Sequence, residues 1–394
     1  MKIKKLGKDE LFEAFLISAY CFHMRIEDAE AQREEIEADK LDNWGAFNDD
    51  GTMMARIINN RYRFYVDGQA VTTGGIGAVS TLPEYRNSGA VKEIFKELLK
   101  FTYGKGEVIS TLYPFKHEFY RKVGYETVTF MNEYTFAPSV LRNYRFDGEV
   151  RKWNNGDAVT DFLDVYNEFA PKFNLAMERD EKAMLEHMKS DKPYIDRRFS
   201  YVFKQEGKPV AYLIFTDVKN DPAAILKVEE CAWICRDGFY AILGFLARFD
   251  ADYGKIKLPL PQGFDLLRII QSPRAYDIEK RTCQHFMIRV VNAKKLLEVI
   301  QKPADCDFTV KVTDEIIEDN NRIYRVKADK VQKVAENRAK KADVELDVRA
   351  LGQMAVGAVN FDEALLRKDV TVNANEEMLR KVFVEKRTFC GEHF

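Results

Sequence analysis

Arg86-Asn87-Ser88-Gly89-Ala90-Val91 lies between a glycine-rich segment, residues 73–81, and an amphipathic segment, residues 89–103. The first segment reads Thr-Gly-Gly-Ile-Gly-Ala-Val-Ser-Thr and is typical of a strand, whereas the second has the apolar period of a helix. Where a helix begins, free backbone N–H groups and a partial positive charge together bind phosphate. Gly89 lets the backbone approach such an anion closely, and Arg86 adds charge. The stretch predicts an anion site, with an ordinary surface turn as the alternative.

The surrounding segments predict a mixed α/β layer of about 140 residues. Three strands are expected over 53–59, 62–66 and 71–81, and Asp67-Gly68 is a strong hairpin signal between the last two. A short strand follows over 108–112. Further strand-like alternation over 126–136 is expected to close the unit. The N-terminal helix is expected to bury one apolar stripe: Leu11, Phe12, Phe15, Leu16 and Ala19.

The bulk composition is that of a soluble globular protein: 394 residues, 46% hydrophobic, 31% charged, with a formal net charge of −2. Such a charge gives no sign of a nucleic-acid or anionic-membrane surface, so neither partner is expected. The basic N-terminus has no apolar region behind it, and no apolar run reaches the ~18–20 residues that cross a bilayer. Six scattered cysteines favour free thiols. We expect a reduced, cytoplasmic protein.

Two further units follow the first. Strands at 201–204, 210–215, 225–234 and 256–260, with helices near 159–169 and 239–249, repeat the order of the first unit and suggest a duplicated fold. The last part of the chain, from about residue 285, is α+β and has no chemical motif of its own. The chain length fits two or three domains at roughly 150 residues each.

Other chemistries are excluded by spacing. Gly75-Ile76-Gly77 lacks the third glycine of a dinucleotide fingerprint and continues as a strand where a helix should begin. No phosphate-binding loop of the Gly-x-x-x-x-Gly-Lys-Ser/Thr type is present. The histidines show no ligand spacing, so no metal is assigned.

The order of these parts resembles the acyl-CoA site of the GNAT superfamily of N-acetyltransferases. In its pattern, Arg/Gln-x-x-Gly-x-Gly/Ala, Arg86 and Gly89 match, whereas Val91 stands where a small residue is usual and is expected to loosen the cradle. The resemblance implies acetyl-CoA as co-substrate and no metal. It assigns cofactor binding to Val79, Thr81, Arg86, Asn87, Ser88, Gly89, Ala90 and Val91.

The same resemblance assigns two catalytic roles. The backbone N–H of Val79 would point at the thioester oxygen, and such a donor stabilises an oxyanion by a few kcal/mol. Tyr120, in Phe119-Tyr120-x-x-x-Gly124-Tyr125, would face the sulfur. A phenol with a pKa near ~10 is neutral at pH 7 and can protonate a thiolate. Core packing is the alternative for Tyr120 and the expectation for Tyr125.

Across its whole length the chain resembles the Eis (enhanced intracellular survival) family. This implies tandem GNAT folds with mixed sheets plus a C-terminal sterol-carrier-like α+β domain. The expected domains are a GNAT acetyltransferase domain at 1–147, a GNAT-like domain without the CoA motif at 148–284, and a sterol-carrier-like domain at 285–394. In the second domain, Arg236-Asp237-Gly238 stands in the cradle's place without its spacing.

In the Eis family the chain ends in an aromatic residue whose carboxylate reaches the active site, and this chain ends in Phe394. A frayed tail is the alternative. His393, with an ordinary pKa near ~6.5, is a second candidate base. We therefore expect an acetyl-CoA-dependent N-acetyltransferase that acts by direct attack in a ternary complex. A trimer or hexamer is also expected.

Of the components of the reaction, the acceptor amine is the one about which the sequence says least. By resemblance, an acidic segment after the first helix would wall a pocket for aminoglycoside-like or polyamine-like substrates, and a lysine side chain is a further candidate. The alternative is a solvated helix face. A non-catalytic CoA- or lipid-binding protein that uses the third domain is the competing function. The acidic residues are Glu27, Asp28, Glu30, Glu34, Glu35, Glu37 and Asp39.

Overall fold

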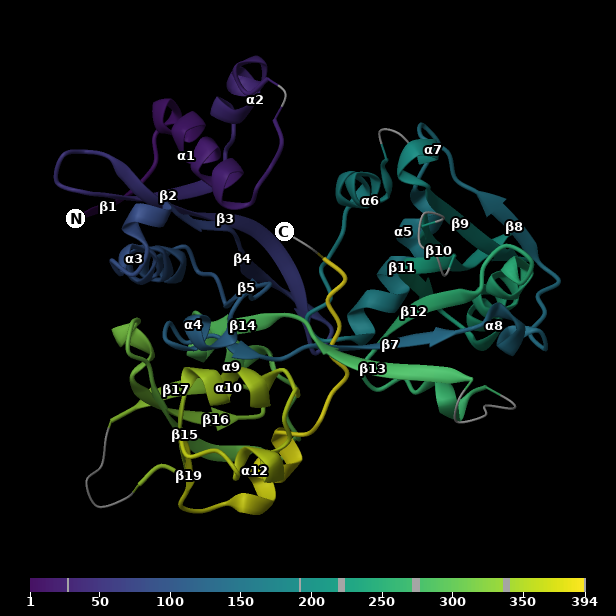
Figure 1. Cartoon of the computed structure of the whole chain (residues 1–394). Helices are drawn as coiled ribbons and strands as arrows, with labels where there is room; N and C mark the ends of the chain where they lie inside the picture. The colour runs from purple at the N-terminus through teal and green to yellow at the C-terminus, as the bar shows by residue number, and fades with distance from the viewer. Residues whose placement is uncertain (27, 191–192, 219–223, 271–276, 336–340, 393–394) are drawn as a thin grey trace. The chain divides into compact units, whose positions relative to one another are not determined.

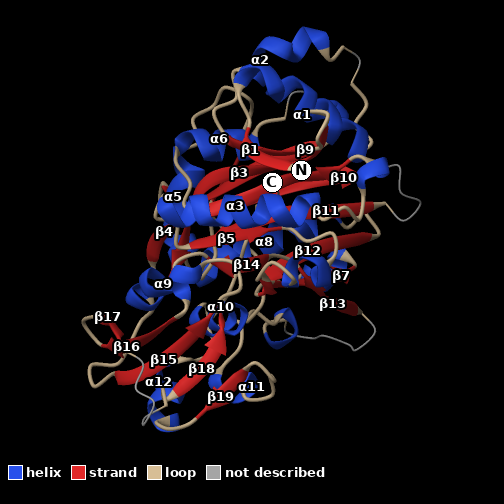
Figure 2. Cartoon of the chain, turned by 90° about the vertical axis from the view of Figure 1, so that its left-hand side faces the viewer, coloured by secondary structure: helices blue, strands red, loops and turns tan. Residues whose placement is uncertain are grey.

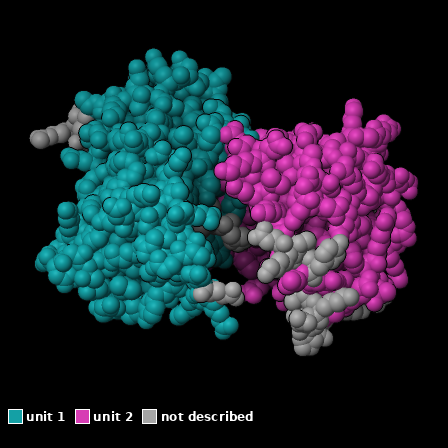
Figure 3. Space-filling model, turned by 90° about the horizontal axis from the view of Figure 1, so that it is seen from above, with its two compact units in different colours: residues 1–128, 286–386, 392–394 teal, residues 129–285, 387–391 magenta. Residues whose placement is uncertain are grey.

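The structure, a computed structural model, describes residues 1–26, 28–190, 193–218, 224–270, 277–335 and 341–392 (Figure 1). The chain forms two compact units, coloured separately in Figure 3. Unit 1 comprises residues 1–128, 286–386 and 392–394, and unit 2 comprises residues 129–285 and 387–391.

The first sheet of unit 1 is mixed, and it contains one parallel pair, β4 and β5. Its strand order is β1-β2-β3-β4-β5-β14-β6. The strands are β1 (Lys2–Lys5), β2 (Asp42–Phe47), β3 (Met53–Val66), β4 (Gln69–Thr81), β5 (Ile109–Leu112), β14 (Met287–Val290) and β6 (Glu126–Thr127).

The helix predicted after the glycine-rich strand is α3 (Ala90–Gly104), and its apolar stripe is buried as expected. The N-terminal helix is α1 (Lys8–Cys21), where Ile17 is buried and Leu16, predicted to be buried, is 41% exposed. The remaining helical segments attached to this sheet are short: η1 (Glu30–Gln32), α2 (Arg33–Glu37), η2 (Pro83–Tyr85) and α4 (His117–Arg121).

The predicted hairpin joins β3 and β4, and the two strands expected before it form one continuous β3. Asp67 and Gly68 have φ values of 49° and 79°, and Val66 pairs with Gln69. Two successive residues with positive φ match the right-handed twist of the flanking strands, which is why Asp-Gly is favoured there.

The sheet of unit 2 repeats this order, because β8-β9-β10-β11-β12-β7-β13 corresponds strand by strand to the first sheet. Its strands are β8 (Glu149–Lys152), β9 (Arg198–Gln205), β10 (Lys208–Val218), β11 (Ile225–Trp233), β12 (Lys255–Pro261), β7 (Phe130–Phe136) and β13 (Ile278–Gln284). The helical segments of unit 2 are η3 (Pro138–Leu141), α5 (Thr160–Phe169), η4 (Ala170–Lys172), α6 (Glu181–Met188), α7 (Pro193–Asp196), α8 (Arg236–Leu246), η5 (Ala247–Phe249) and η6 (Leu266–Arg268).

The two sheets exchange their sixth strands. After β6 the chain leaves the first sheet and enters the second as β7, and after β13 it returns to the first sheet as β14. The segment predicted as one strand over 126–136 is therefore two strands in different sheets. The units divide after Val128 and after His285, whereas the sequence pattern placed divisions after residues 147 and 284.

The third sheet also belongs to unit 1 and is mixed, since β15 and β18 are parallel (Figure 2). Its order is β17-β16-β15-β18-β19. The elements are β15 (Asp307–Thr313), β16 (Arg322–Lys327), β17 (Val331–Val334), β18 (Val344–Asp347), β19 (Val370–Val372), α9 (Ala293–Val299), η7 (Glu318–Asn320), α10 (Val348–Ala355), α11 (Phe361–Ala364) and α12 (Glu376–Val382).

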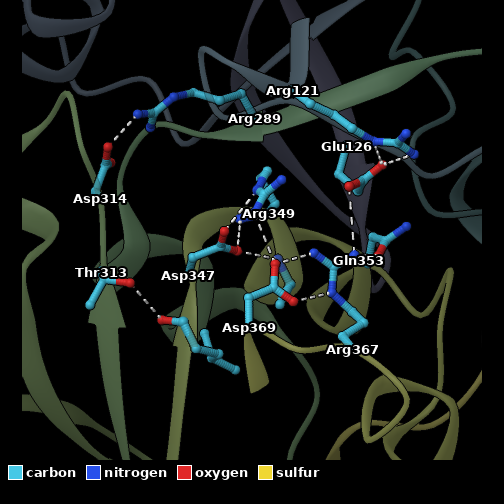
Figure 4. A network of polar contacts seen from close by, with 12 residues as sticks. Arg121, Glu126, Arg289, Thr313, Asp314, Asp347, Arg349, Gln353, Arg367 and Asp369 are labelled. Atoms are coloured by element: carbon cyan, nitrogen blue, oxygen red, sulfur yellow. Dashed lines mark hydrogen bonds and ion pairs between the residues drawn. The ribbon is translucent and has the colours of Figure 1, made fainter. Parts of the chain in front are cut away.

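A buried ion pair ties the first sheet to this third part (Figure 4). Arg289 of β14 is 1% exposed, and its Nη2 lies 2.6 Å from Oδ1 of Asp314. The guanidinium also donates to the carbonyl of Val123. Because both charges are removed from water, losing one partner would leave the other uncompensated. The pair therefore fixes β14 against the segment that follows β15.

A second buried polar pair lies at the far end of α3 from its N-terminus. Asn59 Nδ2 donates to Glu107 Oε1 at 3.1 Å, and both residues are almost fully buried. A Cβ at Gly74 would lie 2.5 Å from Glu107 Oε2, so only glycine fits beneath this carboxyl. Burial raises the pKa of Glu107 from 4.5 to about 7, although the Asn59 hydrogen bond opposes the shift.

We predict that Glu107→Gln changes the pH dependence of stability. Since the folded state holds a proton that the unfolded chain releases above pH ~4.5, this carboxyl stabilises the fold at low pH. That contribution is lost as pH rises to about 7. Glutamine does not titrate, so the variant does not lose stability in this way. Between pH 4.5 and pH 8, the free energy of unfolding of the variant should therefore rise by on the order of 2–3 kcal/mol relative to that of wild type. Urea unfolding of both proteins at both pH values measures this difference. An equal change of stability with pH in wild type and variant would contradict the prediction. Exposed Glu97→Gln is the control.

Candidate active site

The turn into α3 presents a row of backbone N–H groups. Asn87 and Gly89 have φ values of 66° and 84°, and Gly89 is the N-cap of the helix with no side-chain cap. In the described chain, the amides of Asn87, Gly89, Val91 and Lys92 make no hydrogen bond, whereas Ala90 N donates to Ser88 Oγ at 3.3 Å. Unpaired amides at the start of a helix, here one of fifteen residues, are the backbone donors to which anions bind in proteins.

The space around this turn is open. Residues 86–89 are exposed, and a Cβ at Gly89 would meet nothing within 4 Å. Val91 is 8% exposed and packs in the apolar core beneath α3. The expectation that its larger side chain loosens the turn is thus not supported by its position, since the side chain points away from the free amides.

The strand that leads to this turn is bulged. Ser80 pairs with Arg56 and Gly77 with Ile58, so two residues, Ala78 and Val79, lie opposite one on β3. Ala78 has a φ of 50°, and both bulged residues are half-buried. A bulge withdraws a residue from the hydrogen-bonding ladder and redirects its backbone.

The neighbouring strand diverges at the same place. The parallel pairing of β4 with β5 runs from Thr73 and Ile109 to Ile76 and Leu112 and then stops. Residues 77–81 therefore present a backbone edge that β5 does not cover. The bulge, this edge and the turn into α3 follow one another along the chain, so Val79 and Thr81 lead directly to the free amides.

Tyr120 of α4 lies in an aromatic cluster and is 2% exposed. Its ring centroid is 5.3 Å from that of Phe115 and 6.1 Å from that of Phe95. No residue of the described chain hydrogen-bonds to its hydroxyl group. Burial raises the pKa of Tyr120 above its ordinary value, so the phenol stays protonated at neutral pH. Tyr125 is fully buried, with its hydroxyl 2.7 Å from Ser110 Oγ, and is a core residue as predicted.

The end of α1 lies against the end of β4. Ser18 Oγ is 3.1 Å from Ser80 Oγ, and Cys21 Sγ donates to the carbonyl of Thr81 at 3.3 Å. The chain that leaves α1, which contains the acidic segment, therefore begins beside the bulged strand. These two contacts could not be predicted from the sequence, because small polar residues on a helix face carry no distinctive spacing.

The acidic segment is partly neutralised. Arg33 Nε lies 2.7 Å from Glu30 Oε2, and its Nη1 lies 3.3 Å from Glu37 Oε1. Glu34 and Glu35 are exposed on α2. Glu27 lies outside the described residues. Arg33 thus compensates two of the acidic residues, whereas Glu34 and Glu35 present their carboxylates on the surface of α2.

In the described part of unit 2, the strand and helix that correspond to β4 and α3 are joined without such a turn. Residues 82–89 separate β4 from α3, but only residues 234 and 235 separate β11 from α8. A Cβ at Gly238 would lie 2.3 Å from the carbonyl oxygen of Val210, and Gly238 N is capped by Cys235 Sγ. One face of Gly238 is thus packed against β10, and its amide is already hydrogen-bonded.

Phe394 and His393 lie outside the described residues. The segment just before them, residues 387–391, belongs to unit 2. There Phe389 is 4% exposed, and its N–H donates to the carbonyl of Asn174 at 3.0 Å. The chain is thus held within unit 2 three residues before Glu392 and the terminal pair.

The buried carboxylate of Glu230 lies beside Gly391, at the end of this segment. Arg179 donates two hydrogen bonds of 2.8 Å to Glu230, and Tyr212 Oη donates a third of 2.5 Å. Burial alone would raise the pKa of Glu230, but Arg179 and His187 hold it well below its ordinary value. A Cβ at Gly391 would lie 2.7 Å from Glu230 Oε2, which explains the glycine there.

The chain is similar to known acetyltransferases and their structures. A family model described as the acetyltransferase (GNAT) domain matches residues 2–128, and one described as the sterol carrier protein domain matches residues 290–391. A probable N-acyltransferase of unknown function from Enterococcus faecalis V583 has a TM-score of 0.88 and 20% identity, over 100% of this chain and 99% of that one. A search of curated protein sequences gives no match.

Two further solved structures share the fold over 100% of both chains. A GCN5-related N-acetyltransferase from Anabaena variabilis has a TM-score of 0.86 and 19% identity. Eis1 from Mycobacterium abscessus has a TM-score of 0.82 and 18% identity. Likenesses at this identity establish the fold.

By class, residues 2–128 are an acetyltransferase (GNAT) domain. More particularly, the whole chain shares the fold of Eis1, and residues 290–391 match a sterol carrier protein domain, as the sequence predicted. Across the residues that the structure describes, no helix has both the length and the apolar composition needed to span a bilayer. In the same part of the chain, no group of three or more potential ligand side chains is arranged to hold a metal ion.

We predict that Gly89→Ala weakens binding of acetyl-CoA. The positive φ strains any residue with a Cβ by about 1 kcal/mol, and relaxation of that strain reorients the free amides. The dissociation constant should rise about tenfold, measured by calorimetry, with the fold retained. Gly104→Ala in the same helix, which also meets open space but has no positive φ, is the matched control. Equal affinity in both variants would contradict an anion site at this turn.

Proposed function

We propose that the chain transfers an acetyl group from acetyl-CoA to an amine at the bulged edge of β4. The observation that carries this is the succession of three features along one stretch: a bulge at Ala78 and Val79, an uncovered strand edge, and free amides before α3. These supply a hydrogen-bond donor, a binding edge and an anion site in the order that an acyl-CoA molecule requires.

The residues present fit acetyl-CoA as co-substrate. The turn would hold the pyrophosphate through the amides of Asn87, Gly89 and Val91, with charge from Arg86 and contacts from Ser88 and Ala90. Val79 and Thr81 would hydrogen-bond the pantetheine arm along the strand edge. No metal takes part in this proposal.

The proposed reaction needs a neutral amine, a hydrogen-bond donor to the oxyanion, and an acid. The amine nitrogen attacks the thioester carbonyl, and the Val79 N–H stabilises the resulting oxyanion. The C–S bond then breaks, and the Tyr120 phenol gives its proton to the departing thiolate, to be reprotonated from solvent. The raised pKa of Tyr120 suits an acid that must remain protonated before this step.

The proton of the attacking ammonium needs an acceptor. The terminal carboxylate of Phe394 is proposed for this role by resemblance to the Eis family, with His393 or water as alternatives. An α-carboxylate with an ordinary pKa near ~3.5 is a weak base, so it acts best by steering a cation or by relaying the proton through water.

The acceptor is proposed to be an aminoglycoside-like or polyamine-like amine, or a lysine side chain. Exposed Glu34 and Glu35 favour a cationic substrate near the end of α1. By the same resemblance we propose a cytoplasmic homo-oligomer, a trimer or hexamer, that uses neither nucleic acid nor a membrane.

The proposal also concerns the roles of the second and third domains. The GNAT-like domain predicted over 148–284 does not bind CoA, because α8 follows β11 without a phosphate-binding turn. The sterol carrier protein domain at 290–391 supports the competing function of a non-catalytic CoA- or lipid-binding protein. Tight CoA binding without turnover on any amine would favour that alternative.

We predict that Tyr120→Phe lowers kcat about 100-fold at neutral pH, since general acid catalysis contributes 10²–10⁴-fold. The KM for acetyl-CoA should stay within about threefold, because the ring is retained. Tyr125→Phe, a buried phenol of the same cluster, is the control and should lower stability more than kcat. Thiol release monitored with a panel of amines measures both variants. Full activity of the Tyr120→Phe variant would show that Tyr120 is not the general acid.

We also predict that extending the chain by three residues beyond Phe394 lowers kcat at least tenfold, because a peptide bond replaces the terminal carboxylate. Affinity for acetyl-CoA, measured by calorimetry, should be unchanged. Phe394→Leu, which keeps the carboxylate, is the control. Equal turnover by the extended and natural chains would direct the search for the base to His393 or water.

A further inference from the structure

Tyr120 is carried by a helix that is too short to hold it in place alone. Helix α4 has five residues, and a single helical turn gains little stability from its own hydrogen bonds in water. The chain before it is open to solvent, since the side chains of Tyr113 and Phe115 are 48% and 71% exposed. The position of the Tyr120 ring therefore depends on the contacts that hold the rest of this helix and the turn after it.

The residue after Tyr120 is fixed by a buried carboxylate of β6. Arg121 Nε and Nη2 lie 2.9 and 2.8 Å from Oε1 of Glu126. Glu126 is 4% exposed and lies on the edge strand of the first sheet, beside β14. A carboxylate that is removed from water must be held by cations and hydrogen-bond donors, so its position depends on each of its partners.

The sterol carrier protein domain supplies a second cation to this carboxylate (Figure 4). Arg367 Nη1 lies 3.6 Å from Glu126 Oε2, and the same nitrogen donates to Gln353 Oε1 at 2.6 Å. Gln353 of α10 in turn donates to the carbonyl of Thr127 at 2.7 Å. Two side chains from residues 290–391 thus hold β6 at two successive positions.

Arg367 is itself held in one orientation. Its Nε and Nη2 donate to the two carboxylate oxygens of Asp369 at 2.9 and 2.6 Å, which is a bidentate pair. Arg349 donates to the same carboxylate at 3.0 Å and also pairs with Asp347, the N-cap of α10. The guanidinium of Arg367 cannot turn toward solvent without breaking these bonds, so its remaining nitrogen, Nη1, is directed at β6.

We propose that Arg367 is a positioning residue for Tyr120, acting through the carboxylate of Glu126 on helix α4. The inference rests on the proposed function, in which the Tyr120 phenol gives its proton to the departing thiolate. Proton transfer requires the phenol to lie within hydrogen-bond reach of the sulfur, so a small displacement of α4 lowers kcat. The proposal assigns the sterol carrier protein domain a part in catalysis, that of keeping the general acid in place.

Kinetics of the full-length Arg367→Met variant test the proposal. Methionine keeps most of the apolar length of the side chain and removes the guanidinium. The kcat for amine acetylation should fall about tenfold, whereas the KM for acetyl-CoA should stay within about threefold. Arg367→Lys, which keeps the positive charge, should recover part of the loss. Arg380→Met is the matched control and should keep the kcat of wild type, because Arg380 pairs with Asp362 and Glu376 on the surface of the same domain.

A double-variant cycle separates positioning from a general loss of structure. If Arg367 acts through the phenol, Arg367→Met should lower kcat no further in a Tyr120→Phe background, because the group that it positions is already removed. Equal losses in both backgrounds would overturn the proposal. Wild-type kcat with lowered thermal stability in Arg367→Met would also overturn it, because a purely structural contact gives that result.

The experiment distinguishes failure of the proposed function from failure of this inference. Full activity of Tyr120→Phe would refute both, whereas an impaired Tyr120→Phe beside an unimpaired Arg367→Met would refute the inference alone. If no amine is acetylated, hydrogen–deuterium exchange over residues 117–125 replaces turnover as the readout. Faster exchange in Arg367→Met than in Arg380→Met would support the positioning of α4 by Arg367, and equal exchange would overturn it.

Discussion

The separation of β4 from β5 is the constraint on which the site depends. Parallel strands normally satisfy each other's backbone groups, but here the pairing ends at Ile76 and Leu112 while β4 continues to Thr81. The bulge at Ala78 and Val79 also breaks the ladder with β3. Residues 77–81 are thereby left without β5 along one edge, and the free amides of the turn into α3 follow them in the chain. In the proposed reaction the chemistry begins with unsatisfied backbone, and Tyr120 is the side chain added to it.

The comparison of the two units shows how little needs to change to lose such a site. Both sheets have the same strand order, and both contain a bulge in the strand before the central helix. In unit 2 the helix follows at once, and Gly238 packs against the carbonyl of Val210. Instead, Glu230 just beyond that bulge is buried with Arg179 and bounds the segment 387–391. The second sheet thus keeps the fold, and residues 387–391 pack beside its bulged strand.

Local patterns in the sequence correctly predicted those features that depend only on residues close together in the chain. The Asp67-Gly68 hairpin, the buried stripe of α3 and the core position of Tyr125 follow from turn chemistry and periodicity. The exchange of β7 and β14 could not be predicted, because alternation marks a strand without naming its sheet. The contact of Ser18 with Ser80 and the ion pair of Glu126 with Arg367 depend on residues far apart in sequence. For the same reason the carboxyl of Glu107 gave no signal, since its burial comes from Asn59 and Gly74 on other strands.

The central claim is that unit 1 holds acyl-CoA on the unpaired backbone between β4 and α3. Hydrogen–deuterium exchange of the wild-type chain, with and without acetyl-CoA, tests it at the level of single segments. Free amides exchange quickly and slow when they donate to a bound phosphate or carbonyl. The account predicts slower exchange over residues 77–92 of unit 1 and no change over residues 234–239 of unit 2. Unchanged exchange over residues 77–92 at saturating acetyl-CoA, or slowing confined to unit 2, would contradict it.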